Sequence, residues 1–329
     1  MSVSIPGPDV QAHRPAVELS LSRVGVTGVE KVIRIRRDGA EQLYHARLDC
    51  FVDLGPQQKG AHMSRFEEVV NEAIGEVILG EATFKAETLA QHVAERVRER
   101  QDARRAEVTI EARYPEYKPA PVSGIPTQEM YTLFGSAVAS ARGTRRLVGV
   151  AAQGITACPC AQGLVESSSR ARLETAGFSG EQIDRVFEHV AVATHNQRGI
   201  GTLRIGCPEG CDQDIDAGQL LQIVEHSMSS EIYELMKRDD EQAVVEKAHR
   251  RPRFVEDCVR EMVRGVLGAF PGLDHDAFIS AHQENLETIH QHNVVAERYG
   301  LVGELRRELE RGERVSRHTS MRNWLEREI

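Results

Sequence analysis

The sequence predicts an α+β protein in which two tandem modules each place helices on one face of an antiparallel sheet. Three observations predict this class. Alternating apolar residues are typical of half-buried strands, other stretches have amphipathic helical spacing, and the order strand, strand, helix, helix, strand, strand occurs twice without a sequence repeat. We divide the chain into a flexible lead at 1–16, a first module at 17–145, a second module at 146–300 and a helical tail at 301–329.

The first module begins with alternating apolar and polar residues, which predict strands. A helix follows, with Ser64 as its expected N-cap and apolar residues at helical spacing from Phe66 onward. A second helix interleaves acidic with basic side chains, which is typical of a solvated face. A proline-bearing loop then separates two further strands. The predicted strands lie at 17–26, 30–36, 42–53, 107–114 and 127–141, and the second helix at 86–104.

The second module repeats this order of strands and helices. An extended segment ends at Cys158, and a helical region at 163–190 is broken at Gly177–Gly180. A helix that begins near Asp214 or Asp216 follows a further strand. In the tail, Trp324 is predicted to anchor packing. The remaining predicted elements are strands at 145–156, 201–207 and 276–298, and helices at 241–250 and 253–268.

Composition excludes several classes of protein. The 329 residues carry 41 Lys+Arg against 50 Asp+Glu, a net charge of −9, which argues against general nucleic-acid binding but allows a local basic pocket. No apolar stretch is long enough to span a membrane, and no signal peptide is visible. Six cysteines are too few for a disulfide scaffold in a chain of this size. We therefore expect a cytoplasmic protein with reduced thiols and with neither nucleic acid nor membrane as a partner.

A basic cluster follows the strand at 42–53. Lys59, His62, Ser64 and Arg65 lie within seven residues at the expected start of a helix. Helix N-termini offer free N–H groups and partial positive charge, so this cluster could bind a phosphate chain. The alternative is a capped helix with ordinary surface charges.

Cys158 and Cys160 are separated by a single proline. Thiolates prefer soft or borderline metal ions, but this spacing is too short for the usual two-thiolate chelate, so one cysteine at most is expected to be a ligand. The alternative is a pair of buried, inert thiols. Cys207 and Cys211 have a wider spacing but no evident histidine partner, and a loop with two reduced cysteines is the better interpretation.

Histidines supply the other candidates. His195 lies in the polar run 194–198 before a strand and could be a metal ligand or a proton shuttle. His290 and His292 are two residues apart, so in an extended chain both would face one side. The alternative is a surface strand with two histidines. The segment around Glu231 and Glu246 is, taken alone, an ordinary helix-to-loop region.

Together these segments resemble the type IB GTP cyclohydrolase family, which includes an archaeal branch that forms a cyclic phosphate. The resemblance covers about residues 8–298, and order and spacing carry it more than any single motif. The motifs are PDVQ at 8–11, DLGPQQKGAHMSRF at 53–66, ITACPCAQ at 155–162, THNQR at 194–198 and EIYELMKRDDEQAVVEKA from 231, with FVED and ETIHQH after it.

The resemblance implies the tunneling fold, with two similar modules per chain and a homotetramer whose active sites lie at subunit interfaces. It also implies one divalent metal ion per site, Fe²⁺, Mn²⁺ or Zn²⁺. Cys158 resembles the catalytically important metal ligand, and Glu231 with His290 or His292 resembles further ligands. His195 resembles the histidine that contacts the metal or moves protons. Glu246 resembles the carboxylate that holds the guanine ring, and the expected triphosphate pocket comprises Lys59, His62, Ser64, Arg65, Lys237 and Arg238.

The implied activity is ring opening of GTP with formate release and recyclisation to 7,8-dihydroneopterin 3′-triphosphate, the first step of folate and pterin biosynthesis. A helical insert at about 163–193 resembles the archaeal forms and keeps open a second product, the 2′,3′-cyclic phosphate. Two other readings remain: another pterin or deazapurine enzyme of the same fold, and a non-catalytic purine- or pterin-binding protein.

Overall fold

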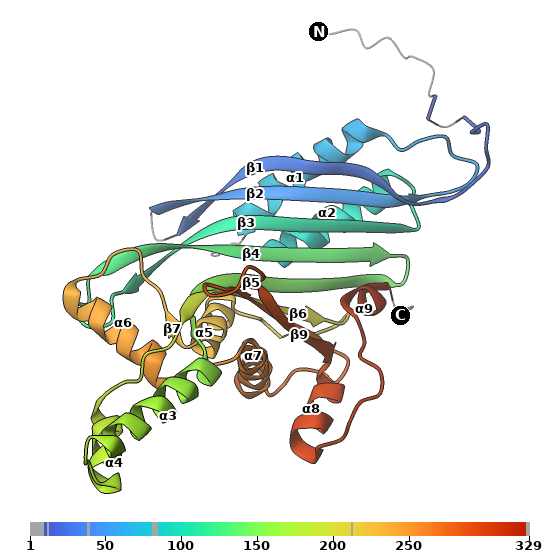
Figure 1. Ribbon diagram of the computed structural model, residues 1–329. Helices are drawn as coiled ribbons and strands as arrows, with labels where there is room; N and C mark the ends of the chain where they lie inside the picture. Colours follow the sequence, from blue (N-terminus) through green and yellow to red (C-terminus); the bar gives the residue numbers. More distant parts are fainter. Residues whose placement is uncertain (1–9, 12, 38–39, 81–84, 212, 327–329) are drawn as a thin grey trace.

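The computed structural model describes residues 10–11, 13–37, 40–80, 85–211 and 213–326. Its centre is one antiparallel sheet with the strand order β1-β2-β3-β4-β5-β6-β8-β9, and the short strand β7 pairs with β5 (Figure 1). The bounds are β1 Leu21–Arg37, β2 Ala40–Leu54, β3 Arg105–Pro119, β4 Pro126–Ser140, β5 Gly143–Ala157, β6 Asn196–Cys207, β7 Ser230–Glu231, β8 Phe278–Leu286 and β9 Val294–Leu301.

Helices pack along this sheet. The first pair packs against β1–β5, and α5 and α7 pack against β5, β6, β8 and β9. The paired helices α3 and α4 project away from the sheet, and α6 runs beside them (Figure 1). The bounds are α1 Met63–Gly80, α2 Ala86–Arg100, α3 Pro159–Thr175, α4 Gly180–His189, α5 Ala217–Ser227, α6 Arg238–Arg250, α7 Val255–Ala269, α8 Val302–Arg311 and α9 Met321–Glu326. The predicted α+β class is confirmed.

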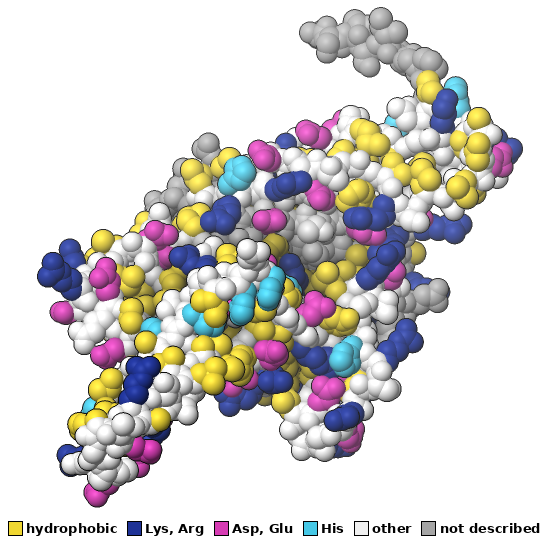
Figure 2. Space-filling view, in the orientation of Figure 1, with side chains coloured by type: hydrophobic (Ala, Val, Ile, Leu, Met, Phe, Trp, Pro, Cys, Tyr) yellow, Lys and Arg dark blue, Asp and Glu magenta, His cyan; other side chains and the backbone are white. Residues whose placement is uncertain are grey.

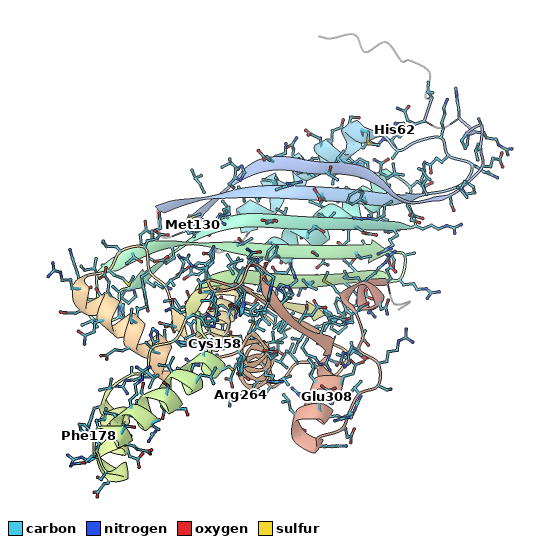
Figure 3. All side chains as sticks on the ribbon, viewed as in Figure 1. His62, Met130, Cys158, Phe178, Arg264 and Glu308 are labelled. Atoms are coloured by element: carbon cyan, nitrogen blue, oxygen red, sulfur yellow. The ribbon has the colours of Figure 1, made fainter. Side chains whose placement is uncertain are left out.

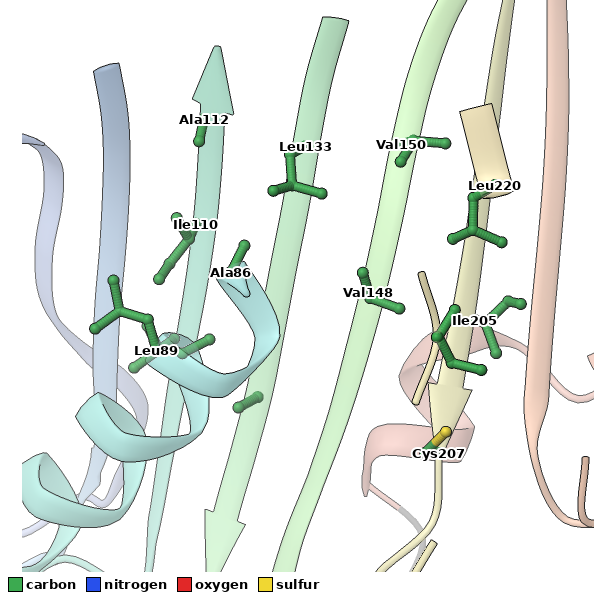
Figure 4. Close-up of a cluster of buried hydrophobic side chains, with 14 of the residues drawn as sticks. Ala86, Leu89, Ile110, Ala112, Leu133, Val148, Val150, Ile205, Cys207 and Leu220 are labelled. Atoms are coloured by element: carbon green, nitrogen blue, oxygen red, sulfur yellow. The ribbon is translucent and has the colours of Figure 1, made fainter. Parts of the chain in front are cut away.

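The core lies between the sheet and its helices. On β4 buried residues alternate with less buried ones, as a sheet with one covered face requires. Side chains from α2, such as Leu89, meet Ile110 and Leu133, while Leu220 of α5 meets Ile205 farther along the same face (Figure 4). The core is continuous across the β4–β5 pair, so both predicted modules contribute strands to one sheet.

Several predicted boundaries are wrong. The helix α1 begins at Met63, so Ser64 lies in its first turn and is not the N-cap. The proline-bearing connection is shorter than predicted, because β3 continues to Pro119. Pro115 is tolerated in β3 because the pairing of β3 with β2 ends at Arg113. Beyond that residue a missing backbone N–H on the β2 side of the strand costs no hydrogen bond between strands.

The last part of the chain differs more. The single strand predicted at 276–298 is a hairpin, β8 and β9, joined by residues 287–293. The predicted helical tail contains two short helices, α8 and α9. Trp324 on α9 is 1% exposed, so its predicted packing role is confirmed. In the described part of the chain, no helix has both the length and the apolar composition needed to cross a membrane.

Candidate active site

Antiparallel pairing brings three chain segments to one end of the sheet. Ala157 at the end of β5 pairs with Asn196 at the start of β6, and Arg198 pairs with Leu286 at the end of β8. Cys158, His195 and Glu287 each lie one residue beyond these strand ends. Residues far apart in sequence therefore meet because of strand register alone. Figure 3 labels Cys158 at this place.

Cys158 is held at the N-terminus of α3. It is the N-cap of that helix, and its Sγ accepts a hydrogen bond from the Ala161 N–H at 3.5 Å. Its own N–H donates to the His195 carbonyl at 3.1 Å, and the Thr194 hydroxyl donates to the Cys158 carbonyl at 2.9 Å. Cys158 is half-buried and Cys160 exposed, so the alternative of two buried thiols is wrong.

Three other cysteines are unsuited to chemistry at neutral pH. Burial raises the pKa of the Cys50, Cys207 and Cys258 thiols to about 12, which keeps them protonated. Cys207 and Cys211 both have free thiols, as the sequence predicts. Of the two cysteines in the CPC motif, only Cys158 forms a backbone hydrogen bond with His195 among the described residues, which favours Cys158 as the functional thiol.

His195 and Glu287 form a largely buried pair. The His195 side chain is 13% exposed and the Glu287 side chain 6%, and Nδ1 of the histidine lies 3.8 Å from Oε2 of the glutamate. Nδ1 also lies 3.1 Å from the Gln197 side-chain oxygen. The Glu287 Oε2 atom is buried without a hydrogen-bond partner among the described residues. A buried carboxylate oxygen in this state is costly unless a cation or donor reaches it.

Glu287 is a residue that the sequence reasoning missed, although it opens the ETIHQH motif. A strand at 276–298 would place Glu287 on the face opposite His290. In the structure this stretch is an exposed connection that carries both histidines. The His290 and His292 rings stack at 5.2 Å, and the His290 ring lies 6.4 Å from that of His195. Glu287, His195, His290 and His292 thus follow one another in space, each near the next, and we call these four side chains the row of imidazoles.

Glu231 lies in a different environment. It is in β7, opposite Gly154, which is four residues before Cys158 on β5. Lys247 Nζ contacts its Oε2 at 2.5 Å, and His226 Nε2 lies 3.5 Å from its Oε1. Burial is the largest single effect and would raise the pKa of this carboxyl, but the Lys247 hydrogen bond, the backbone hydrogen bond and the charges of Lys247 and His226 together lower it. Glu231 is thus an ionised carboxylate that already has cationic partners.

The helix α6 carries the next group of candidates. Lys237, Arg238 and Glu246 are all exposed, and Glu246 accepts a hydrogen bond from Gln242 at 3.4 Å. The helix lies between the β3–β4 turn and the Cys158 segment. At its far end, the His249 carbonyl accepts from Gln162 of α3 at 2.6 Å, and His249 Nε2 lies 3.3 Å from the Thr194 carbonyl.

Asp240 fixes the start of α6. Its carboxylate accepts hydrogen bonds from the Val122 and Ser123 N–H groups, both at 2.8 Å, from the Ser123 hydroxyl at 2.6 Å and from the Lys237 N–H at 2.9 Å. The bonds from Ser123, ahead of the other N–H donors, hold the pKa of Asp240 far below its usual value. Lys237 and Arg238 are thereby positioned by a buried acid that the sequence reasoning did not single out.

We expect this acid to make the protein acid-sensitive. A lowered pKa in the folded state contributes stability above the unfolded value of 3.8, and this is lost as pH falls below it. The urea midpoint of the wild type should therefore fall between pH 5 and pH 3 more steeply than that of Asp240→Asn, which should be less stable at pH 7. Equal slopes for the two proteins would contradict the assignment.

The basic cluster lies at the other end of the sheet. His62 exchanges two hydrogen bonds with the Gln101 side chain, and Arg65 donates to the Arg100 carbonyl at 3.0 Å, while Lys59 and Ser64 are exposed. The 15-residue strand β5 separates this end from Cys158 by roughly 45 Å. Figure 3 shows His62 at the upper right and Cys158 well away from it, at the lower centre. One chain therefore does not bring the expected phosphate cluster to the thiol.

The donors near Cys158 fit a divalent metal ion in kind. Thiolate, imidazole and carboxylate suit Fe²⁺, Mn²⁺ or Zn²⁺, and the unpartnered Glu287 oxygen is a free ligand atom. Within the described residues, however, no three His, Cys, Asp or Glu side chains are gathered closely enough to hold an ion. The predicted set of Cys158, Glu231, His290 and His292 is therefore not assembled as a cluster in the single chain.

The architecture defines the class of protein. Uricase from Arthrobacter globiformis has a similar fold, with a TM-score of 0.52 at 10% identity, over 90% of this chain and 96% of the uricase. The protein thus has the α+β tunneling fold, as its sequence predicts. At this identity the likeness extends to the fold alone.

The family model described as Type I GTP cyclohydrolase folE2 matches residues 8–296, and the chain belongs to that family. It is 41% identical over 308 residues to "GTP cyclohydrolase MptA" of Methanococcus aeolicus, covering 92% of this chain and 99% of the relative. The protein with the same description from Methanosarcina mazei is 40% identical over 312 residues, covering 92% and 97%. The predicted family is confirmed.

Proposed function

We propose that this protein is a metal-dependent GTP cyclohydrolase that opens the imidazole ring of GTP, releases formate and recloses the product as a dihydropterin. The observation that carries the proposal is the convergence of Cys158, His195 and Glu287 at one sheet end in a chain that matches GTP cyclohydrolases over nearly its whole length. With GTP as substrate and six free thiols, we expect the enzyme in the cytoplasm.

His195 is the residue best placed to move protons. When Nδ1 of His195 carries a proton, that N–H donates a hydrogen bond to the Gln197 side-chain oxygen. Nε2 is then left to take up or deliver a proton as the imidazole ring of the guanine opens. Glu287 lies behind the same nitrogen and stabilises the imidazolium that would form. Low exposure of both side chains limits competition from water.

A bound divalent ion would supply a water of lowered pKa for attack on C8 of the guanine. Cys158, with the imidazole of His290 or His292, would hold the ion, and Glu287 offers a further oxygen. Glu231 would bind or orient one of its cationic neighbours, Lys247 or His226. Glu246 is exposed on α6 and is available to the N1–H and the exocyclic amino group of a guanine.

The separation of the two candidate clusters supports an oligomer. Lys59, His62, Ser64 and Arg65 can contribute to a phosphate site next to Cys158 only when a second copy supplies them, because roughly 45 Å of sheet separates them in one chain. We therefore propose a homo-oligomer, in the simplest case a tetramer, with shared active sites. Lys237 and Arg238 would contribute from the Cys158 side.

Two products are consistent with this chemistry: 7,8-dihydroneopterin 3′-triphosphate and its 2′,3′-cyclic phosphate counterpart. The helices α3 and α4, which fill the stretch between the CPC motif and His195, and the full-length match to Methanococcus proteins favour the cyclic phosphate. The linear triphosphate remains the other candidate.

One incubation tests the function. Purified protein with GTP and Fe²⁺ or Mn²⁺ under anoxic conditions should release formate and give a pterin that fluoresces after oxidation. Mass spectrometry of its phosphate groups distinguishes the two products. Binding of GTP without formate release would instead identify a non-catalytic purine-binding protein and contradict the proposal.

Metal removal gives a separate prediction. Because thiolate and imidazole donors lie at the site, dialysis against a chelator should abolish formate release, and Fe²⁺, Mn²⁺ or Zn²⁺ should restore it. The measurement is formate released per protomer before and after readdition. Undiminished formate release by metal-free protein would contradict the proposed metal dependence.

A further inference from the structure

An arginine-rich cavity lies at the end of the sheet opposite Cys158. It has a volume of about 920 Å³ and lies between α2, the ends of β3–β5 and α9. Figure 2 shows basic side chains on this side of the molecule. Seven arginines and three acids line it: Arg23, Arg98, Arg104, Arg105, Arg142, Arg145, Arg322, Asp102, Glu107 and Glu326.

The three acids do not neutralise the arginines. Glu107 pairs with Arg23 and Arg105, each at 3.1 Å. Glu326 on α9 pairs with Arg322 at 2.9 Å and with Arg105 at 3.4 Å. Two of the remaining guanidinium groups, Arg98 and Arg104, form no ion pair with any described residue. The lining thus carries four more positive than negative charges, in a chain whose net charge is −9.

Such a concentration of like charge is unfavourable unless an anion occupies it. Guanidinium groups present paired N–H donors that match the oxygens of a phosphate. The guanidinium groups of Arg98 and Arg104, which have no ion-pair partner among the described residues, are the donors left to such an anion. A site that collects positive charge within an acidic protein attracts anions selectively.

We propose that this cavity binds the polyphosphate group of a nucleotide or of an inorganic polyphosphate. The four-charge surplus matches a triphosphate better than a single phosphate or a carboxylate. None of the described lining residues has an aromatic ring on which a base could stack, so recognition is of the phosphates. The cavity volume lies in the range of small-ligand sites.

Within one chain this cavity is separate from Cys158 and from the row of imidazoles. In one chain the two lie at opposite ends of β5, and Arg322 and Glu326 belong to α9, which follows the residues 8–296 shared with the family. The inference does not rest on the proposed cyclohydrolase activity. A tail that follows the shared family region therefore forms one wall of the cavity.

Calorimetry with inorganic tripolyphosphate tests the proposal on the full-length protein. The wild type should bind it with an affinity that falls as salt rises. The double variant Arg98→Ala/Arg104→Ala should bind at least tenfold more weakly, and Arg322→Gln should weaken binding through the α9 wall. Arg260→Ala, an exposed arginine on α7, is the matched control and should bind like the wild type.

GTP, as a competitor, separates the two sources of the polyphosphate. Displacement of tripolyphosphate by GTP would identify a nucleotide, and its absence an inorganic polyphosphate. No binding by the wild type, or equal binding by the double variant, would overturn the proposal. The proposal would also be overturned by a double variant that binds tripolyphosphate normally but changes oligomeric state in light scattering, because the arginines would then contact a second copy. Formate release by the wild type, measured in parallel, reports on the cyclohydrolase proposal separately.

Discussion

A Cys158→Ala variant is expected to release formate from GTP on the order of 10³-fold more slowly than the wild type. Cys158 is hydrogen-bonded to His195 through its backbone, and an alanine in its place has no side-chain atom that could bind a metal ion or accept the Ala161 N–H. The measurement is kcat for formate release at saturating metal. The effect should be on kcat and not on KM, because the phosphate-binding residues are unchanged.

Folding of this variant can be checked against its neighbour. Loss of the N-cap acceptor costs about 1 kcal/mol, which leaves the protein folded. Cys160→Ala is the matched control, since Cys160 is exposed in the first turn of the same helix, and it should keep activity within about twofold of the wild type. Full activity of Cys158→Ala in the presence of metal would remove the thiol from the mechanism.

The fold was predictable where burial follows a simple period. On β4 and β6, buried residues alternate along most of the strand, so the sequence pattern and the structure carry the same information. The β8–β9 hairpin was missed because its connection, residues 287–293, is polar and contains neither glycine nor proline, the usual signals of a turn. Trp324 was recognisable because a lone tryptophan in a charged tail has few roles other than packing.

The site was predictable as residues but not as an arrangement. Cys158 and His195 stood out as residue types, yet their proximity depends on the β5–β6 register, which single-sequence patterns do not encode. Glu287 does not stand out, because the pattern around it predicts a strand that would turn its side chain away from His290. For Lys59 and Arg65 the chain order gives no indication that they lie a full strand length from Cys158. Asp240 looked like one of several surface acids, and only its four donors reveal its role.

Replacing Trp324 with alanine should lower the free energy of unfolding by about 3–5 kcal/mol. The indole is 1% exposed, stacks on Phe278 with ring centroids 5.7 Å apart, and donates its N–H to the Asp276 carbonyl at 2.8 Å. It also fits against Gly206 of β6, where a Cβ would come within 2.6 Å of the ring. The cavity left by alanine cannot close, because strand backbone forms its floor. Urea titration followed by circular dichroism measures the loss.

Trp324→Phe distinguishes the two contributions. A phenyl ring keeps the stack on Phe278 but loses the indole N–H, so the loss should be about 1–2 kcal/mol. Trp324 follows the 8–296 region that the family model matches. It nevertheless packs against β6 and β8, and its backbone carbonyl accepts a hydrogen bond from Arg145. If both variants unfold like the wild type, the tail is not part of the cooperative unit. If Trp324→Ala is destabilised as expected, it should also weaken tripolyphosphate binding, because the same helix carries Arg322 and Glu326 into the arginine-rich cavity.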